Sequence, residues 1–139
     1  MSAKDVLKLM KSKNIEFVDL RFTDPRGKLQ HLTMDTTIVD EGMLNDGVFF
    51  DGSSIAGWKA INESDMILKP DLSRKVIDPY TSHNTLILFC DILDAVKRDP
   101  YERDPRGIAK KAEAYLKKTG IGDTAYFGPE PEFFVFDDV

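Results

Sequence analysis

Of all residues in the sequence, two glutamates near the C-terminus, Glu130 and Glu132, are the clearest candidates for a chemical role. They alternate with prolines in Gly-Pro-Glu-Pro-Glu-Phe-Phe. Side chains two apart on a strand share a face, which would place the two carboxylates together, roughly 6–7 Å apart at the backbone. Carboxylate oxygens are the ligands that Mg²⁺ prefers, but two glutamates fill only part of an octahedral set. Their spacing alone therefore leaves two interpretations open: half of a metal site, or solvated residues on an exposed strand face.

A second polar cluster is Asp51-Gly52-Ser53-Ser54. A short acid, a permissive glycine and two hydroxyls suit a tight loop that presents a carboxylate and backbone N–H groups to a small ligand. The lysine and spacing of a phosphate-binding P-loop are absent. A plain Asx-turn without a ligand is the alternative that these residues leave open.

The histidines, the tryptophan and the cysteine could also take part in chemistry, but the sequence favours structural roles for them. His31 and His83 lie near the ends of predicted strands, and neither has a second histidine at ligand spacing. Trp58 is expected to pack against other side chains and not to contact a ligand. Cys90, the single cysteine, lies in an apolar run and is expected to be a buried, inert thiol.

A small sheet with few helices must position these residues. Ser2 and Asp5 predict a capping box at the start of a helix over 3–12. The stretches 15–22 and 28–33, separated by the turn 24–27, predict a β-hairpin. Further elements are expected in the middle of the chain: a short helix at 39–45 and strands at 65–69, 75–78 and 85–93.

The last third of the chain begins with a polar stretch, 94–103, which is typical of a linker. Asp104 is then expected to cap a helix that has Pro105 at its first position and stops at Gly120. Residues 124–136 predict a strand. Because that strand would be left unpaired, we expect the sequence to continue beyond Val139.

Composition narrows the class of protein. With 139 residues, 42% hydrophobic and 31% charged, the chain fits one globular domain or a small domain with an appendage. The absence of a long apolar run or a signal peptide predicts a cytoplasmic protein without membrane association. A net charge of -5, with lysines and arginines scattered among acids, argues against a nucleic-acid partner.

Taken together, several stretches resemble the N-terminal part of glutamine synthetase of the long bacterial type. They follow one another in the family's order and with family-like spacing across nearly the whole chain. The matching segments are 17–24, 27–28, 50–55, 57–58, 62–66, 103–106 and 127–134.

The resemblance implies an α+β fold, with a β-grasp domain at residues 1–100. Residues 101–139 would then be the start of the catalytic domain, with its first helix and first strand. The predicted sheet followed by a polar stretch agrees with this division.

The resemblance further implies ATP-dependent joining of ammonium to glutamate through a γ-glutamyl phosphate, with two Mg²⁺ or Mn²⁺ ions in the site. Glu132 would help to hold the ion that orders glutamate, and Glu130 the ion at the ATP phosphates. Asp51 matches the aspartate that takes a proton from ammonium, with Ser54 beside it. In the family this loop completes the site of a neighbouring subunit, which requires an oligomer. The resemblance to the long bacterial type implies that this oligomer is a homododecamer.

The chain itself is expected to be an incomplete and inactive fragment of such an enzyme. Two alternatives remain: a related γ-glutamyl-amine ligase of the same superfamily, and a non-catalytic β-grasp interaction module. The Glu130 and Glu132 pair argues against the module, because a pure binding domain has no use for it.

Overall fold

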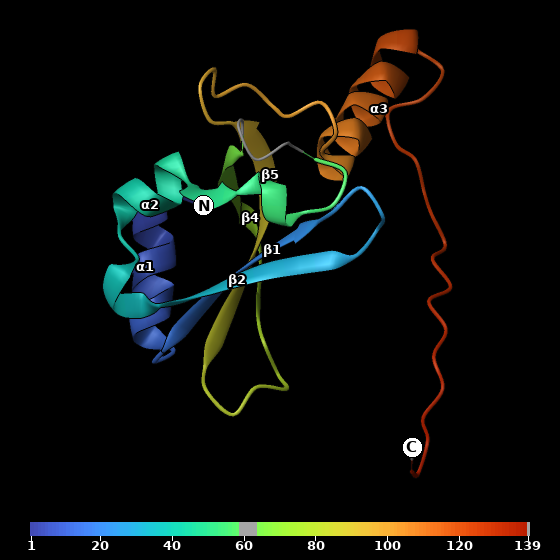
Figure 1. Cartoon of the computed structure of the whole chain (residues 1–139). Coiled ribbons are helices and arrows are strands. Elements are labelled where there is room, and N and C mark those ends of the chain that lie inside the picture. Colours follow the sequence, from blue (N-terminus) through green and yellow to red (C-terminus); the bar gives the residue numbers. More distant parts are fainter. Residues whose placement is uncertain (59–63, 139) are drawn as a thin grey trace. The chain divides into compact units, whose positions relative to one another are not determined.

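The computed structural model describes residues 1–58 and 64–138, and it divides into two compact units, Met1–Ala109 and Lys110–Val139 (Figure 1). Residues 62 and 63 of the segment 62–66 that resembles glutamine synthetase, and Val139, lie outside the described residues.

A five-stranded mixed sheet forms the first unit (Figure 1). Its order is β2-β1-β5-β4-β3; β1 and β5 are parallel in the centre, and the other neighbours are antiparallel. The strands are β1 (Phe17–Thr23), β2 (Leu29–Asp35), β3 (Val48–Asp51), β4 (Asp65–Ile77) and β5 (Thr85–Asp94). The predicted hairpin is confirmed as β1 and β2.

Two short helices lie side by side next to the sheet, α1 (Ala3–Ser12) and α2 (Glu41–Asp46) (Figure 1). The predicted capping box is present: the Ser2 hydroxyl accepts from the Asp5 N–H, and the Asp5 carboxylate accepts from the Ser2 N–H. Asp40 caps α2 through a single hydrogen bond, which its carboxylate accepts from the Met43 N–H. Two single turns of 3-10 helix complete this unit, η1 (Thr36–Ile38) and η2 (Gly52–Ser54).

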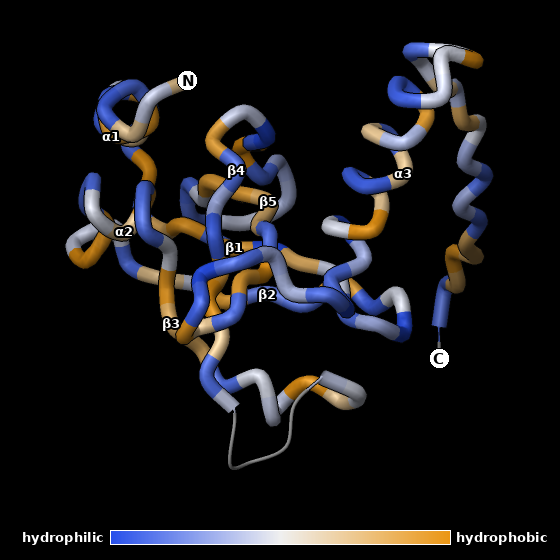
Figure 2. Tube along the Cα trace, turned by 90° about the horizontal axis from the view of Figure 1, so that it is seen from above, coloured by the Kyte–Doolittle hydropathy of each residue, from blue (hydrophilic) through white to orange (hydrophobic). Residues whose placement is uncertain are grey.

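The hydrophobic core lies between these helices and one face of the sheet. Alternate residues of the central strands enter it, among them Val18 and Leu20 of β1 and Leu86 and Leu88 of β5, all fully buried. Hydrophobic residues gather where β1, β4 and β5 meet (Figure 2). Cys90 is buried in this cluster, and its burial raises the pKa of the thiol, as expected for an inert cysteine.

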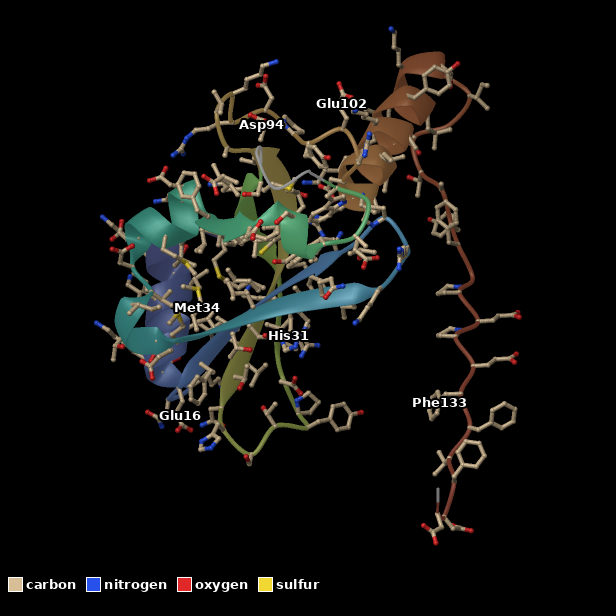
Figure 3. The ribbon with its side chains drawn as sticks, in the orientation of Figure 1. Glu16, His31, Met34, Asp94, Glu102 and Phe133 are labelled. Atoms are coloured by element: carbon tan, nitrogen blue, oxygen red, sulfur yellow. The ribbon has the colours of Figure 1, made fainter. Side chains whose placement is uncertain are left out.

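The opposite face of β1 carries a buried carboxylate, Asp19. It accepts hydrogen bonds from Arg21 Nε at 2.7 Å and Thr33 Oγ1 at 2.8 Å, and it lies 2.9 Å from His31 Nδ1. Burial raises the pKa of Asp19, but these hydrogen bonds outweigh it, so the net pKa lies below its ordinary value. His31 projects from β2 (Figure 3), and its contact with Asp19 of β1 agrees with the structural role expected for it.

The structure corrects two expectations, for the strands at 65–78 and for residues 94–103, and adds one strand. The strands predicted at 65–69 and 75–78 are one strand, β4, because the chain passes Pro70 with a shift of register before Lys75 instead of stopping. The strand β3 was not predicted. Residues 94–103 are not a free linker, because Tyr101 N–H donates to Ile92 O at 2.9 Å and Pro100 bridges to Leu93.

Asp104 joins the start of α3 (Pro105–Thr119) to the sheet, and the predicted cap is confirmed. One carboxylate oxygen accepts from the Arg106 N–H at 3.0 Å, and the other accepts from the Ile92 N–H of β5 at 3.1 Å. The side chain is 1% exposed, and burial raises its pKa. Arg106 adds ion pairs to Asp91, at 2.8 Å, and to Asp71.

Replacing Asp104 by alanine should therefore destabilise the chain by roughly 2–3 kcal/mol, because the helix loses its cap and the buried Ile92 N–H loses its acceptor. Asp104→Asn should cost less, since an amide keeps one acceptor oxygen. Urea unfolding of the 139-residue chain, followed by far-UV circular dichroism, measures the difference. The exposed Asp99→Ala serves as control, and equal midpoints for Asp104→Ala and Asp99→Ala would contradict the prediction.

The second unit contains the later turns of α3 and an extended segment, 121–138. Gly120, at φ +70°, ends the helix as predicted. The strand predicted at 124–136 is wrong: these residues pair with no strand in the part of the chain that the structure describes, and Pro129 and Pro131 have no N–H to donate. Its aromatic side chains, including Phe133, are exposed within this unit (Figure 3).

Among residues 1–58 and 64–138, no helix is long and apolar enough to cross a membrane.

Candidate active site

The loop that carries Asp51 is fixed at its first residues by the sheet. Asp51 is the last residue of β3 and pairs with Asp65 of β4. The next residue, Gly52, donates its N–H to Ser64 O at 2.7 Å. A Cβ at Gly52 would lie 2.3 Å from Met66 Sδ and 2.9 Å from Ser64 O. Only glycine allows the loop to pass this close to β4.

The Asp51 carboxylate is exposed and is held by serines. One oxygen accepts from Ser53 N at 2.8 Å and from Ser53 Oγ at 2.6 Å. Hydrogen bonds from Ser53, then from Ser64 and Ser54, lower the pKa of Asp51. The Asx-turn suggested by the sequence is therefore present, and the structure brings Asp51 and Ser54 together. The carboxylate stays ionised near neutral pH and can bind a small cation.

An aromatic cluster packs behind the loop. Trp58, 4% exposed, lies with its ring centroid 5.6 Å from that of Phe22 and 6.0 Å from those of Phe50 and Tyr101. The expected packing role of Trp58 is confirmed. Tyr101 was missed in the sequence because the stretch around it is polar, although an aromatic residue beside the helix cap was a usable signal.

Glu130 and Glu132 lie in the extended segment of the second unit, and both are exposed there. Their oxygens have the donor chemistry of a hard divalent cation, so the residues fit a Mg²⁺ or Mn²⁺ ion in part. No group of three or more His, Cys, Asp or Glu side chains that could hold a metal occurs among residues 1–58 and 64–138. The predicted metal-ligand roles of Glu130 and Glu132 therefore stay predictions.

A cavity of about 260 Å³ elsewhere in the first unit is lined by Arg21, Arg106, Cys90 and neighbouring residues of β1 and β5. Both guanidinium groups already pair with carboxylates, Arg21 with Asp19 and Asp78 and Arg106 with Asp71 and Asp91. The cavity therefore offers no free charge to an anion, and we assign it no role.

The mixed sheet with a parallel central pair, followed by a capped helix, defines a β-grasp domain leading into a second domain. Models of two glutamine synthetase domains match the chain, the β-grasp domain at residues 14–95 and the catalytic domain at residues 102–139. The chain therefore belongs to the glutamine synthetase family, and the resemblance seen in the sequence is confirmed. The boundary between residues 100 and 101 stays a prediction.

Curated relatives named glutamine synthetase match almost the whole chain. The protein of Rhizobium meliloti is 64% identical over 138 residues, which are 99% of this chain and 29% of the relative. The protein of Methylococcus capsulatus is 60% identical and that of Escherichia coli 56%, each over 100% of this chain and 30% of the relative. The chain thus spans about 29% of the length of the curated relatives that it matches.

Solved structures share the fold. A Plasmodium falciparum glutamine synthetase matches with a TM-score of 0.79 at 26% identity, over 88% of this chain and 24% of that one. A structure of apo GmaS matches with a TM-score of 0.73 at 21% identity, over 84% and 27% of the two chains, which shows the common fold alone. The expected α+β class with a β-grasp domain is confirmed.

Proposed function

We propose that this chain supplies the β-grasp domain and part of the metal site of an ATP-dependent glutamate–ammonia ligase, with glutamate, ammonium and ATP as substrates. The observation that carries the proposal is the 64% identity to a glutamine synthetase over nearly the whole chain, together with an ionised aspartate exposed on a fixed turn. The reaction would activate the glutamate side chain as a γ-glutamyl phosphate, and ammonia would then displace the phosphate.

Asp51 would bind ammonium and receive its proton. An alkylammonium such as lysine holds its proton to a pH of about 10, whereas the pKa of Asp51 lies below the ordinary value of about 3.9. Proton transfer to Asp51 in the ground state is therefore unfavourable. We infer that Asp51 first holds the cation and then accepts a proton from it, and that the resulting ammonia, which now has a lone pair, attacks. The Ser54 hydroxyl would orient the same nitrogen.

Glu130 and Glu132 would hold two divalent ions, Mg²⁺ or Mn²⁺, with further ligands from outside this chain. Such ions supply positive charge to the phosphate oxygens of ATP and to the glutamyl phosphate. Because two carboxylates provide only part of the coordination shell, we expect the 139-residue chain alone to form no glutamine.

The proposed protein is a cytoplasmic homododecamer in which the Asp51 loop completes a neighbouring subunit's site. The exposure of the Asp51 carboxylate within its own unit supports this, because the group is accessible to a substrate and to another chain. No nucleic acid and no membrane is proposed as a partner.

The experiment is a chimera in which this chain replaces the matched 29% of the Rhizobium meliloti glutamine synthetase. The chimera should form glutamine from glutamate, ammonium and ATP, and Asp51→Asn should lower kcat/KM for ammonium on the order of 10²- to 10⁴-fold. Asp46→Asn, also exposed, is the matched control. An assembled chimera that is inactive while the parent is active would refute the proposal.

The same chimera also tests the alternative that the protein is a γ-glutamyl-amine ligase. Rates with ammonium and ethylamine are compared with those of the parent. A preference shifted strongly toward the amine would favour that alternative over ammonium as the substrate.

A further inference from the structure

The far end of the Asp51 loop is fastened by the stretch that was predicted to be a linker. Tyr101 donates its hydroxyl hydrogen to Trp58 O at 2.9 Å. Arg103 Nη1 donates to Gly57 O at 2.9 Å and, more weakly, to Trp58 O at 3.4 Å. We call Tyr101 and Arg103 the brace.

The brace is itself anchored to the sheet and to the helix cap. The Tyr101 N–H donates to Ile92 O of β5 at 2.9 Å, and Tyr101 O accepts the Asp104 N–H at 3.1 Å. The Tyr101 ring also contacts the Trp58 ring in an edge-on arrangement, with centroids 6.0 Å apart. Movement of the brace is therefore restricted by the same groups that hold β5 and the start of α3.

The loop between Asp51 and Trp58 is short and is fixed at both ends. Its first end is held by the pairing of Asp51 with Asp65 and by the Gly52 N–H to Ser64 O bond. Its second end is Gly57, at φ +91°, followed by the buried Trp58. The acceptors of the brace are backbone carbonyls, so the brace sets the path of the loop backbone that follows Asp51 and Ser54.

We propose that Tyr101 and Arg103 are positioning residues for Asp51: they hold its loop in the conformation that binds ammonium. The inference rests on the proposed function of Asp51. Groups that bind a small cation gain from being fixed before binding, because the cost of ordering the loop is then not taken from the binding free energy. The brace donates to the carbonyls of Gly57 and Trp58, so its effect on Asp51 passes through the loop backbone.

The first test uses the 139-residue chain, in which Trp58 is the single tryptophan. Tyr101→Phe and Arg103→Gln should increase quenching of Trp58 fluorescence by acrylamide and speed amide hydrogen exchange over residues 52–58, because the loop opens more often. The exposed residues Tyr80 and Arg74 provide the matched controls, Tyr80→Phe and Arg74→Gln. Unchanged quenching and exchange in both brace variants would overturn the proposal, whatever the activity.

The second test uses the chimera with the Rhizobium meliloti enzyme. Each brace variant should raise KM for ammonium about 2- to 10-fold, the equivalent of one lost hydrogen bond, and leave KM for ATP unchanged. Arg103→Lys should restore part of the loss, since it keeps a charged donor. A faster-opening loop with unchanged KM for ammonium would overturn the positioning role.

The two tests separate the inference from the function beneath it. A chimera without any activity would refute the proposed function and with it the positioning role. Quenching and exchange in the 139-residue chain would still decide whether the brace holds the loop.

Discussion

Glu130→Gln and Glu132→Gln are each expected to lower glutamine formation by the chimera on the order of 10²- to 10⁴-fold. Glutamine has nearly the shape of glutamate but lacks the negative charge that binds a hard cation. A metal ion that offsets phosphate charge is worth several kcal/mol, and each 1.36 kcal/mol is tenfold in rate. Together with that of Asp51→Asn, these are the largest effects on activity that we expect from single substitutions in this chain.

The measurement is activity as a function of Mg²⁺ and Mn²⁺ concentration, together with calorimetric titration of Mn²⁺ without ATP. If the two glutamates hold different ions, each variant should lose one of two binding events and keep the other. Glu113→Gln is the control, because Glu113 is exposed and its ion pair with Lys117 is of the surface type, which contributes little. Full activity in both variants at low metal concentration would contradict the metal-ligand roles.

Gly47→Ala is expected to destabilise the 139-residue chain by roughly 3–5 kcal/mol, the largest effect on stability that we predict. Gly47 follows α2 with φ +86° and ψ -175°, a region that is essentially restricted to glycine. A Cβ there would lie 2.4 Å from Leu68 O and 2.6 Å from Ile67 Cγ2. Strain and overlap act together, and the overlap is with the backbone of β4, which cannot move without disturbing the sheet.

Gly27→Ala separates the two causes. Gly27 has φ +84°, but nothing lies within 4 Å of the position that its Cβ would take. It should therefore show the backbone strain alone, about 1–2 kcal/mol. Urea unfolding of both variants, followed by circular dichroism, gives the difference; equal losses would mean that the overlap with β4 contributes nothing.

Local signals in the sequence were sufficient for the helices and the hairpin. The capping box of Ser2 and Asp5, the cap at Asp104 and the stop at Gly120 depend on neighbours within four residues, so they can be read without the fold. Pro70 misled the prediction of β4 because a proline often ends a strand. Here β4 tolerates Pro70 because its pairing with β5 shifts register between Pro70 and Lys75. That shift can be seen only once the partner strand is known.

The errors near the site have a common cause, which is contact between distant residues. Residues 124–136 have the alternation of a strand, but a strand also needs a partner, and none is present among the described residues. The polar stretch 94–103 has the composition of a linker, yet Tyr101 and Arg103 bind carbonyls of residues 57 and 58. Composition does not record such contacts. The roles given to Asp51, Ser54, Glu130 and Glu132 came from the family resemblance and stay predictions.

The parallel pairing of β1 with β5 also affects how the protein is made. Phe17 pairs with Thr85, so the inner edge of β1 has no partner until β5 has been synthesised. At about 5–20 residues per second, the ribosome needs roughly 3–12 seconds to pass from the end of β1 to the start of β5. During that interval the nascent hairpin of β1 and β2 presents an open strand edge and an apolar face. We therefore expect the nascent chain to be more prone to aggregation before β5 has left the ribosome than after β5 has paired with β1.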